Sequence, residues 1–279
     1  MSPATTSCNG NPEIDDSFTL RKSGLQGKVA IIASRNSGKC IPSELAQILV
    51  LEGCKPYIAE AKEKVLEIIL KEVENYTSTR IMGKAFDFFE PGNIERFVEF
   101  VKEKEGRVDI LVTDLGLLDF VYNLKPFLEQ QRRNWQLQIQ DIFEAAMLWC
   151  RGVIPVMMES KSGRIIHVVS DAASVGVPKM SVYGACKAAV CAFSRSLAHE
   201  LAPYKITVNC VSLGLQEIDE IKDPSEEAVI KLDKSLKFVP LRRYGEPEEI
   251  AAMVAYLASD LGAYITGQTI HVSGGLVMT

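Results

Sequence analysis

Short apolar runs alternate with longer amphipathic stretches along most of the chain. The apolar runs predict buried strands at residues 29–32, 55–59, 109–113, 164–169, 206–211 and 269–272. Spacings typical of helices lie between them, at residues 41–52, 61–75, 91–105, 126–157, 181–202 and 246–258. Strands that alternate with helices favour a parallel sheet covered by helices on both faces. The pattern therefore predicts an α/β fold.

The same pattern suggests how the chain is divided. No repeat or linker interrupts the alternation between residues 25 and 279, so we expect a single domain there. Residues 1–24 are rich in Ser, Thr, Asn, Asp and Pro and show little periodicity. This composition predicts a flexible N-terminal arm, with a partner-binding arm as the alternative.

Composition narrows the classes of function. The chain of 279 residues has a net charge of −5, which gives no support for binding to nucleic acid or to an anionic membrane. No apolar run reaches the roughly 18 residues that a membrane-spanning helix needs, and no secretory signal is visible. The seven Cys form no CxxC pair and the three His are scattered. We therefore expect free thiols in a reducing, cytoplasmic compartment and no metal site.

The loop after the first predicted strand lies where α/β proteins bind a nucleotide phosphate. It reads ASRNSGKC, and Ser34, Gly38 and Cys40 would occupy the positions of a three-glycine dinucleotide loop. Ser34 and Cys40 each add a Cβ where the backbone has to approach the pyrophosphate. Taken alone, this loop favours an ordinary strand–helix connection over a working site, although Lys39 could meet a phosphate.

Two long segments resemble the short-chain dehydrogenase/reductase family. They are SVYGACKAAVCAFSRSLAHELAPYKITVNCVSLG (181–214) and LRRYGEPEEIAAMVAYLASDLGAYITGQTIHVSGG (241–275). GKVAII at 27–32 and VDILVTDLG at 108–116 resemble the first and fourth strands of that family. The resemblance covers residues 25–279. It implies a doubly wound Rossmann sheet of about seven strands, in chains that assemble as dimers or tetramers.

The resemblance also implies a catalytic group made of Ser170, Tyr183 and Lys187. Tyr183 and Lys187 are spaced i, i+4, so they share one helix face. A neighbouring ammonium favours the phenolate and lowers the pKa of a tyrosine. In the family the Ser polarises a substrate oxygen, and the Lys also holds the nicotinamide ribose.

Further family positions imply a site for NAD, if a cofactor binds at all. The residues that would contact it are Ser34, Gly38, Glu60, Asp87, Gly116 and Lys187. Glu60 ends the second predicted strand, where an acidic residue binds the adenosine ribose and favours NAD over NADP. Asp87 would contact the adenine. Both acids could equally be surface carboxylates.

Several of these segments depart from the family pattern. The family's Asn-Asn-Ala-Gly reads Thr-Asp-Leu-Gly at residues 113–116. Ile142 stands where the family has an Asn that holds a water, and its side chain cannot form a hydrogen bond. Ile218 stands where the family has a Thr that contacts the nicotinamide. Together with the altered loop, these departures predict impaired cofactor binding.

Three functions remain open. The first is a subunit that has lost its cofactor and supports an active paralogue, as in heteromeric dehydrogenases such as hydroxybenzylsuccinyl-CoA dehydrogenase. The second is a self-sufficient NAD-dependent alcohol or 3-hydroxyacyl dehydrogenase with a small-molecule or acyl-CoA substrate. The third is a cofactor-free acid–base enzyme using Tyr183. The Cβ atoms of Ser34 and Cys40 could cost several kcal/mol of the free energy of cofactor binding. A micromolar affinity corresponds to roughly 8 kcal/mol, so this loss favours the first function.

The pattern also predicts how subunits meet. In the family, the long helices before and after the strand that ends at the catalytic Ser pack against a neighbouring subunit. The second of these, residues 181–202, carries small or apolar residues around much of its circumference, including Ala189 and Ala192. A helix that is apolar beyond one stripe needs cover on a second side. We therefore expect an oligomer, formed with a paralogue or with a second copy.

Overall fold

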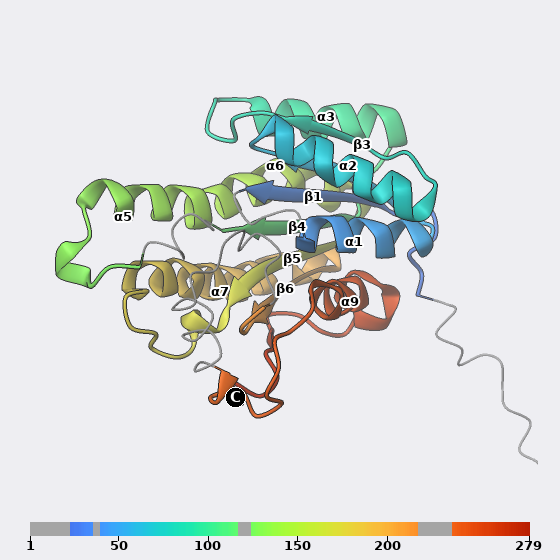
Figure 1. The fold of residues 1–279 in the computed structure, drawn as a ribbon. Coiled ribbons are helices and arrows are strands. Elements are labelled where there is room, and N and C mark those ends of the chain that lie inside the picture. Colours follow the sequence, from blue (N-terminus) through green and yellow to red (C-terminus); the bar gives the residue numbers. More distant parts are fainter. Residues whose placement is uncertain (1–22, 36–39, 117–123, 217–235) are drawn as a thin grey trace, which may run out of the picture.

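A seven-stranded parallel sheet forms the centre of the computed structural model, which describes residues 23–35, 40–116, 124–216 and 236–279. The strand order is β3-β2-β1-β4-β5-β6-β7 (Figure 1). The strands are β1 (Val29–Arg35), β2 (Lys55–Glu60), β3 (Met82–Ala85), β4 (Ile110–Leu115), β5 (Gly163–Ser170), β6 (Ile206–Leu213) and β7 (Thr269–Val272). The predicted doubly wound Rossmann-type α/β fold is confirmed.

Helices cover both faces of this sheet. One face packs against α1 (Cys40–Leu51), α2 (Glu63–Thr77) and α9 (Pro247–Ala258). The other packs against α3 (Asn93–Glu105), α6 (Ala145–Ser160) and α7 (Ser181–Leu201). Each layer encloses its own hydrophobic core.

The first strand shows why a continuous apolar run indicates a strand that is buried on both faces. Val29, Ile31 and Ala33 belong to the core under α3, α6 and α7, whereas Ala30 and Ile32 belong to the core under α1, α2 and α9. A strand buried on both faces has no polar side, so its sequence is continuously apolar rather than alternating.

Two elements differ from the expectation. β3 has the sequence MGKA and lies at the edge of the sheet, where its residues are only partly buried, so no apolar run marked it. The helix expected at 126–157 is divided. It consists of η2 (Phe127–Glu129), α5 (Arg132–Gln138), the π-helical segment η3 (Ile139–Glu144) and α6. Gln130 and Gln131 have extended backbone angles, which separate η2 from α5.

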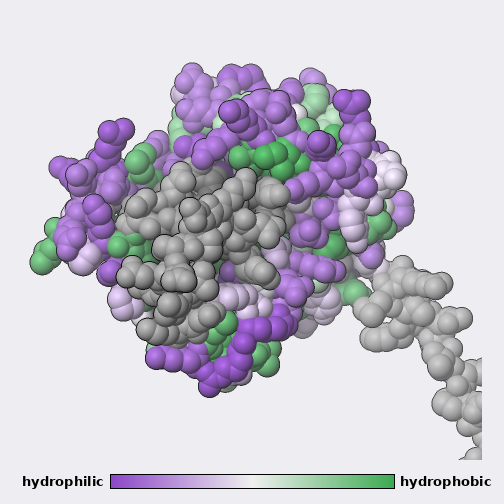
Figure 2. All heavy atoms as spheres, viewed as in Figure 1, coloured by the Kyte–Doolittle hydropathy of each residue, from purple (hydrophilic) through white to green (hydrophobic). Residues whose placement is uncertain are grey.

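On the face shown in Figure 2, the coloured residues are mostly hydrophilic, with hydrophobic residues in small groups. Among the described residues, no helix is both long and apolar enough to cross a membrane. The predicted N-terminal arm stays a prediction, because residues 1–22 lie outside the described part. Ser23, the first described residue, accepts a hydrogen bond from the backbone N–H of Asp260 at 2.8 Å.

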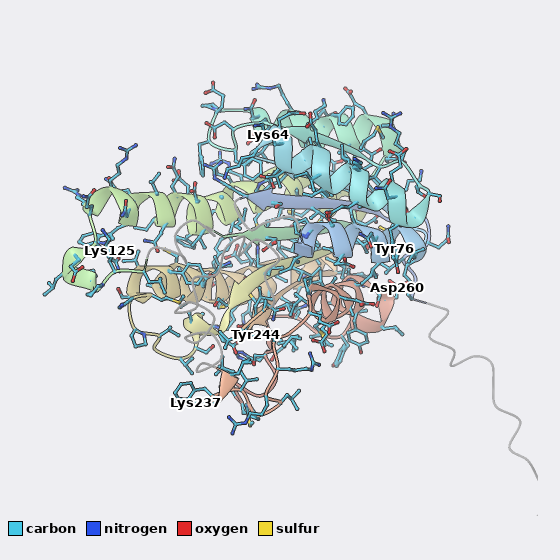
Figure 3. The ribbon with its side chains drawn as sticks, in the orientation of Figure 1. Lys64, Tyr76, Lys125, Lys237, Tyr244 and Asp260 are labelled. Carbon is cyan, nitrogen blue, oxygen red and sulfur yellow. The ribbon has the colours of Figure 1, made fainter. Side chains whose placement is uncertain are left out.

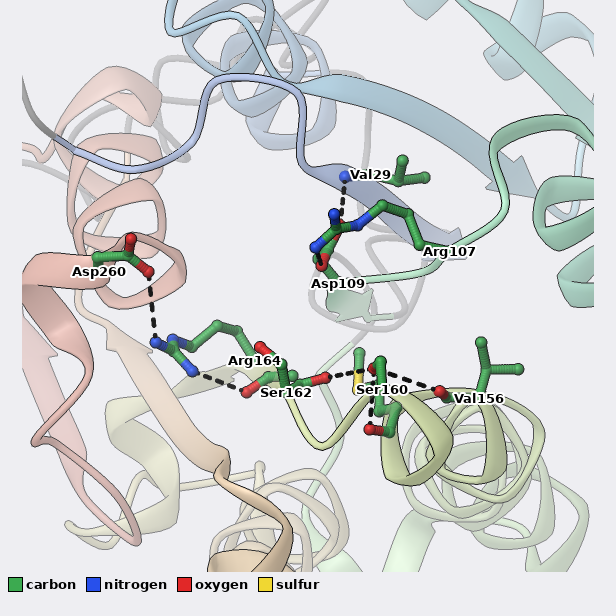
Figure 4. A network of polar contacts seen from close by, with 10 residues as sticks. Val29, Arg107, Asp109, Val156, Ser160, Ser162, Arg164 and Asp260 are labelled. Carbon is green, nitrogen blue, oxygen red and sulfur yellow. Dashed lines mark hydrogen bonds and ion pairs between the residues drawn. The ribbon is translucent and has the colours of Figure 1, made fainter.

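Asp109 joins the amino-terminal ends of two central strands (Figure 4). Its Oδ2 accepts hydrogen bonds from the backbone N–H of Val29, at 2.9 Å, and from Nε of Arg107, at 2.7 Å. Asp109 is 4% exposed, so its charge is stabilised mainly by these donors. At the same edge of the sheet, Nη2 of Arg164 lies 3.7 Å from Oδ1 of Asp260. Figure 3 labels Asp260 beside α9.

We predict that Asp109→Ala lowers the free energy of unfolding by about 2–4 kcal/mol, because it leaves a buried N–H without its acceptor and removes a partly buried ion pair with Arg107. Urea unfolding followed by circular dichroism measures the change. Glu159→Ala is the matched control, since Glu159 pairs with Lys102 on the surface and its side chain is 66% exposed. That change should cost less than about 1 kcal/mol. Equal losses in the two variants would contradict the prediction.

Candidate active site

Ser170 is the last residue of β5, at the carboxyl edge of the sheet. The chain turns there into η4 (Asp171–Ala173), and the Ser170 Oγ accepts a hydrogen bond from the backbone N–H of Ala172 at 3.3 Å. A serine in this capping position satisfies a backbone donor that the short helix cannot satisfy itself. The hydroxyl is thereby held where β5 opens onto the ligand-binding edge of a parallel sheet.

The start of α7 packs directly against this turn. A Cβ at Gly184 would lie 2.5 Å from the carbonyl oxygen of Ala172, so only a glycine allows the two segments to approach so closely. Tyr183 precedes Gly184 and is therefore placed next to the turn that carries Ser170. This close approach fixes the start of α7 against the turn that follows Ser170.

Lys187 lies one helical turn after Tyr183 and is 4% exposed. Its Nζ donates hydrogen bonds to the carbonyl oxygens of Leu115, at 2.7 Å, and Val168, at 3.1 Å. The same ammonium lies 5.7 Å from the centre of the Tyr183 ring. The structure thus holds the Lys187 ammonium close to the Tyr183 ring and to the end of β5, the strand that Ser170 terminates. An ammonium has three donors, and two of those on Lys187 are used by the protein's own backbone.

A second polar contact joins β4 and β5, the two strands whose carbonyl oxygens bind Lys187. Thr113 of β4 and His167 of β5 are paired in the sheet, with Thr113 Oγ1 lying 2.7 Å from Nδ1 of His167. The other ring nitrogen lies 3.6 Å from the Cys150 sulfur. Burial lowers the pKa of His167 to about 4, and the nearby charge of Lys187 contributes to the shift. This histidine is therefore neutral near pH 7.

The predicted ribose contact, Glu60, is completely buried. Its Oε1 accepts backbone hydrogen bonds from Ala61, at 2.8 Å, and Lys62, at 3.1 Å. Burial raises the pKa of Glu60, and the negative charge of Asp114 raises it further. A hydrogen bond from the side chain of Ser34 acts in the opposite direction.

Ser34 lies between these two acids in the sheet. It is paired with Glu60 on β2 and with Asp114 on β4, and all three side chains are at least 96% buried. Two carboxylates therefore flank the residue that stands in the first glycine position of the loop. Their charges oppose an approaching pyrophosphate.

Two other predicted cofactor contacts have local structural roles. Asp87 is exposed, and its Oδ1 accepts a hydrogen bond from the backbone N–H of Phe89 at 3.0 Å. The backbone N–H of Gly116 donates to the carbonyl oxygen of Arg35 at 3.1 Å, which extends the pairing of β1 and β4. The predicted contacts Gly38 and Ile218 lie outside the described residues.

Ile142 is 1% exposed and lies in the core between the sheet and the helices α3, α6 and α7. Two sets of polar contacts near the site were not predicted from the sequence. Arg35 Nε donates to Oδ1 of Asp141 at 2.7 Å, and the Arg35 guanidinium lies 5.0 Å from the centre of the Phe89 ring. The sequence did indicate that Arg35 has a special role, because it is a charged residue at the end of an apolar strand.

A second unanticipated network begins at the residue after Ser170. Oδ1 of Asp171 accepts a hydrogen bond from Ser212 at 2.7 Å and lies 2.6 Å from Nδ1 of His271. Asp171 is 2% exposed. The network ties the turn that carries Ser170 to β6 and β7. Only the pairing of the strands brings residue 171 next to residue 271.

Comparison with known proteins agrees with this geometry. The family model for enoyl-(acyl carrier protein) reductase matches residues 36–277. The chain is 34% identical, over 256 residues, to the 3-oxoacyl-(acyl-carrier-protein) reductase of Vibrio cholerae, covering 91% of this chain and 99% of that protein. The chain belongs to the short-chain dehydrogenase/reductase family.

Other relatives support the same membership. The 3-oxoacyl-(acyl-carrier-protein) reductase of Synechocystis is 33% identical over 259 residues, covering 91% of this chain and 98% of that protein. Among solved structures, a variant of a Serratia marcescens short-chain dehydrogenase/reductase superposes with a TM-score of 0.78 at 27% identity, covering 90% of this chain and 98% of that one.

Short-chain dehydrogenases use a nicotinamide dinucleotide, and the described residues do not fit that group well. Oε1 of the ribose contact Glu60 is hydrogen-bonded by the protein itself, whereas the buried Oε2 has no hydrogen-bond partner among the described residues, and Ser34 fills the first glycine position. Ile142 cannot hold the expected water. These departures lie among the expected dinucleotide contacts and not at Ser170, Tyr183 or Lys187. In the described part of the chain, no group of three or more His, Cys, Asp or Glu could hold a metal ion.

We predict that His167 makes the protein less stable in acid. Its folded-state pKa of about 4 lies below the ordinary value of 6.5. The unfolded chain therefore binds a proton first, and stability that is present above pH 6.5 is lost as the pH falls towards 4. The loss amounts to about 3 kcal/mol. Urea unfolding between pH 7 and pH 4 should show this slope in the wild type and a shallower one in His167→Gln.

His199→Gln is the control, because His199 is exposed on α7. This variant should keep the wild-type slope. The raised pKa of Glu60 acts in the opposite direction, but it is common to all three proteins and cancels in the comparison. A His167→Gln variant with an unchanged slope would contradict the assignment of a neutral, buried histidine.

Proposed function

We propose that this chain is a short-chain dehydrogenase/reductase subunit that binds NAD(H) weakly and supports a paralogous subunit with an intact glycine loop. The observation that carries the proposal is the state of Glu60. In the role that the resemblance implies, its carboxylate accepts hydrogen bonds from a ribose. Here the carboxylate is buried, bonded to two backbone amides and to Ser34.

The retained group gives the subunit a site for an oxygen-bearing substrate. The Ser170 hydroxyl can donate a hydrogen bond to a carbonyl or alcohol oxygen, and Tyr183 can exchange a proton with it. The Lys187 ammonium lies 5.7 Å from the centre of the Tyr183 ring. The relatives act on 3-oxoacyl groups, which supports a 3-hydroxyacyl or 3-oxoacyl thioester as the substrate class.

A self-sufficient NAD-dependent short-chain dehydrogenase is the second candidate. The close packing at Gly184, which places Tyr183 beside the turn of Ser170, favours it. Its strongest support is the 34% identity to a catalytic reductase. The two candidates differ in one measurable quantity, the affinity for the dinucleotide.

Exposed apolar side chains support an interface with another subunit. In η2, Phe127 and Leu128 are 50% and 94% exposed, and the Phe127 ring stacks on Trp135 with the ring centres 5.1 Å apart. This end of α5 projects from the body of the protein (Figure 1), close to Lys125 in Figure 3. On α7, Ala192 is also exposed.

We predict that the purified chain binds NAD(H) with a dissociation constant of about 1 mM or weaker, because the loop and the ribose contact are both altered. Isothermal titration calorimetry measures it. Ser34→Gly combined with Cys40→Gly should restore binding only in part, since Thr113, Asp114 and Ile142 remain. A low-micromolar constant for the wild type would refute the proposal and favour the self-sufficient enzyme.

We predict that the chain co-purifies from its native source with a paralogue that carries the glycine loop. Ala192→Glu should split that complex and lower the partner's activity, because it places a charge in an apolar helix contact. Ala192→Ser is the control and should leave the complex intact. Size-exclusion chromatography with mass analysis gives the composition. A lone monomer, or a homo-oligomer with its own dehydrogenase activity, would contradict the mixed assembly.

A further inference from the structure

Arg35 and Asp141 form an ion pair above the carboxyl edge of the sheet. The Arg35 Nε to Asp141 Oδ1 distance is 2.7 Å, and the two side chains are 19% and 5% exposed. The guanidinium also lies over the ring of Phe89. A partly buried pair of this kind interacts more strongly than the surface pairs of the molecule, because water screens it less.

The position of the pair is its most informative property. Arg35 ends β1, and in the sheet it is paired with Leu115, which ends β4. β2 and β3 extend the sheet on one side of these strands, whereas β5, β6 and β7 extend it on the other. The strand order therefore reverses between β1 and β4, and open α/β sheets bind their ligands in the crevice at such a point.

Asp141 reaches this crevice from the opposite side. It lies in the π-helical segment η3, directly before Ile142. Segments of π-helix occur mostly as single turns inside α-helices, often at functional sites. The ion pair thus links the end of β1, where a phosphate-binding loop begins, to the helix that faces the active site.

Arginine is well suited to bind a phosphate. Its planar guanidinium presents several N–H donors in a fork that matches the oxygen atoms of a phosphate group. In this structure Asp141 accepts from one of these donors and neutralises the charge. Glu60 and Asp114 add two further buried carboxylates near the end of β1.

We propose that Arg35 is an anion-binding residue for the phosphates of a nucleotide in this crevice, and that Asp141 competes with those phosphates for it. The idea rests on the proposed function in one respect, since this competition is one cause of weak dinucleotide binding. The poor fit of the cofactor is then partly imposed by the chain's own ion pair, and a single neutral substitution relieves it.

The test compares Asp141→Asn with the wild type by isothermal titration calorimetry, with ADP and inorganic pyrophosphate as probes. Asp141→Asn keeps the shape of the side chain and removes its charge. It should bind both probes about tenfold more tightly, equivalent to about 1.4 kcal/mol. Circular dichroism confirms the fold. If this variant does not fold, Asp141→Ser tests the same loss of charge.

The Arg35→Gln background separates the proposed competition from a general effect of charge. In Arg35→Gln, the change Asp141→Asn should produce no gain, because no guanidinium is released. The matched control is Glu159→Gln, which removes one acid from the surface pair with Lys102 and should leave ADP binding unchanged. An equal gain with and without Arg35, or no gain in Asp141→Asn, would overturn the proposal.

The proposed function is tested separately by the NAD(H) titration of the wild type. A wild type that binds NAD(H) tightly, together with a gain in Asp141→Asn, would refute the partner-subunit function and leave the role of Arg35 standing. Weak NAD(H) binding by the wild type, without a gain in Asp141→Asn, would refute the role of Arg35 and leave the partner-subunit function standing.

Discussion

The buried ammonium of Lys187 is the constraint on which the site depends. A charge that is 4% exposed is costly unless hydrogen bonds replace its water. The carbonyl oxygens of Leu115 and Val168 do this, and they come from the ends of two neighbouring strands. The contact of Thr113 with His167 joins the same two strands, and the bonds of Lys187 hold α7, which also carries Tyr183, against their ends.

The two halves of the site rest on different kinds of interaction. The acid–base half is set by backbone packing, above all by the approach of Gly184 to the turn after β5. The dinucleotide half depends on particular side chains at the ends of β1, β2 and β4. Side chains can differ there without disturbing the sheet, because the sheet is held by its backbone hydrogen bonds.

Electrostatics explains why the altered half is unfavourable to a dinucleotide. Glu60 and Asp114 are buried beside Ser34, and the raised pKa of Glu60 reflects how poorly this region accommodates negative charge. The positive charge of Arg35, which could offset the two acids, is neutralised by Asp141. Asp141 thereby offsets a positive charge of the kind that attracts phosphates.

The sequence by itself determined the fold class, because apolar runs are local and survive changes elsewhere, and its motif spacing predicted Ser170, Tyr183 and Lys187 as the catalytic group. It also identified Ile142 as unable to hold a water. It missed β3, whose edge position requires no apolar run. Only the tertiary structure showed that Arg35 meets Asp141, that Asp171 meets His271, and that Glu60 is buried against Ser34. These contacts depend on strand register and helix packing, which bring together residues far apart in the chain.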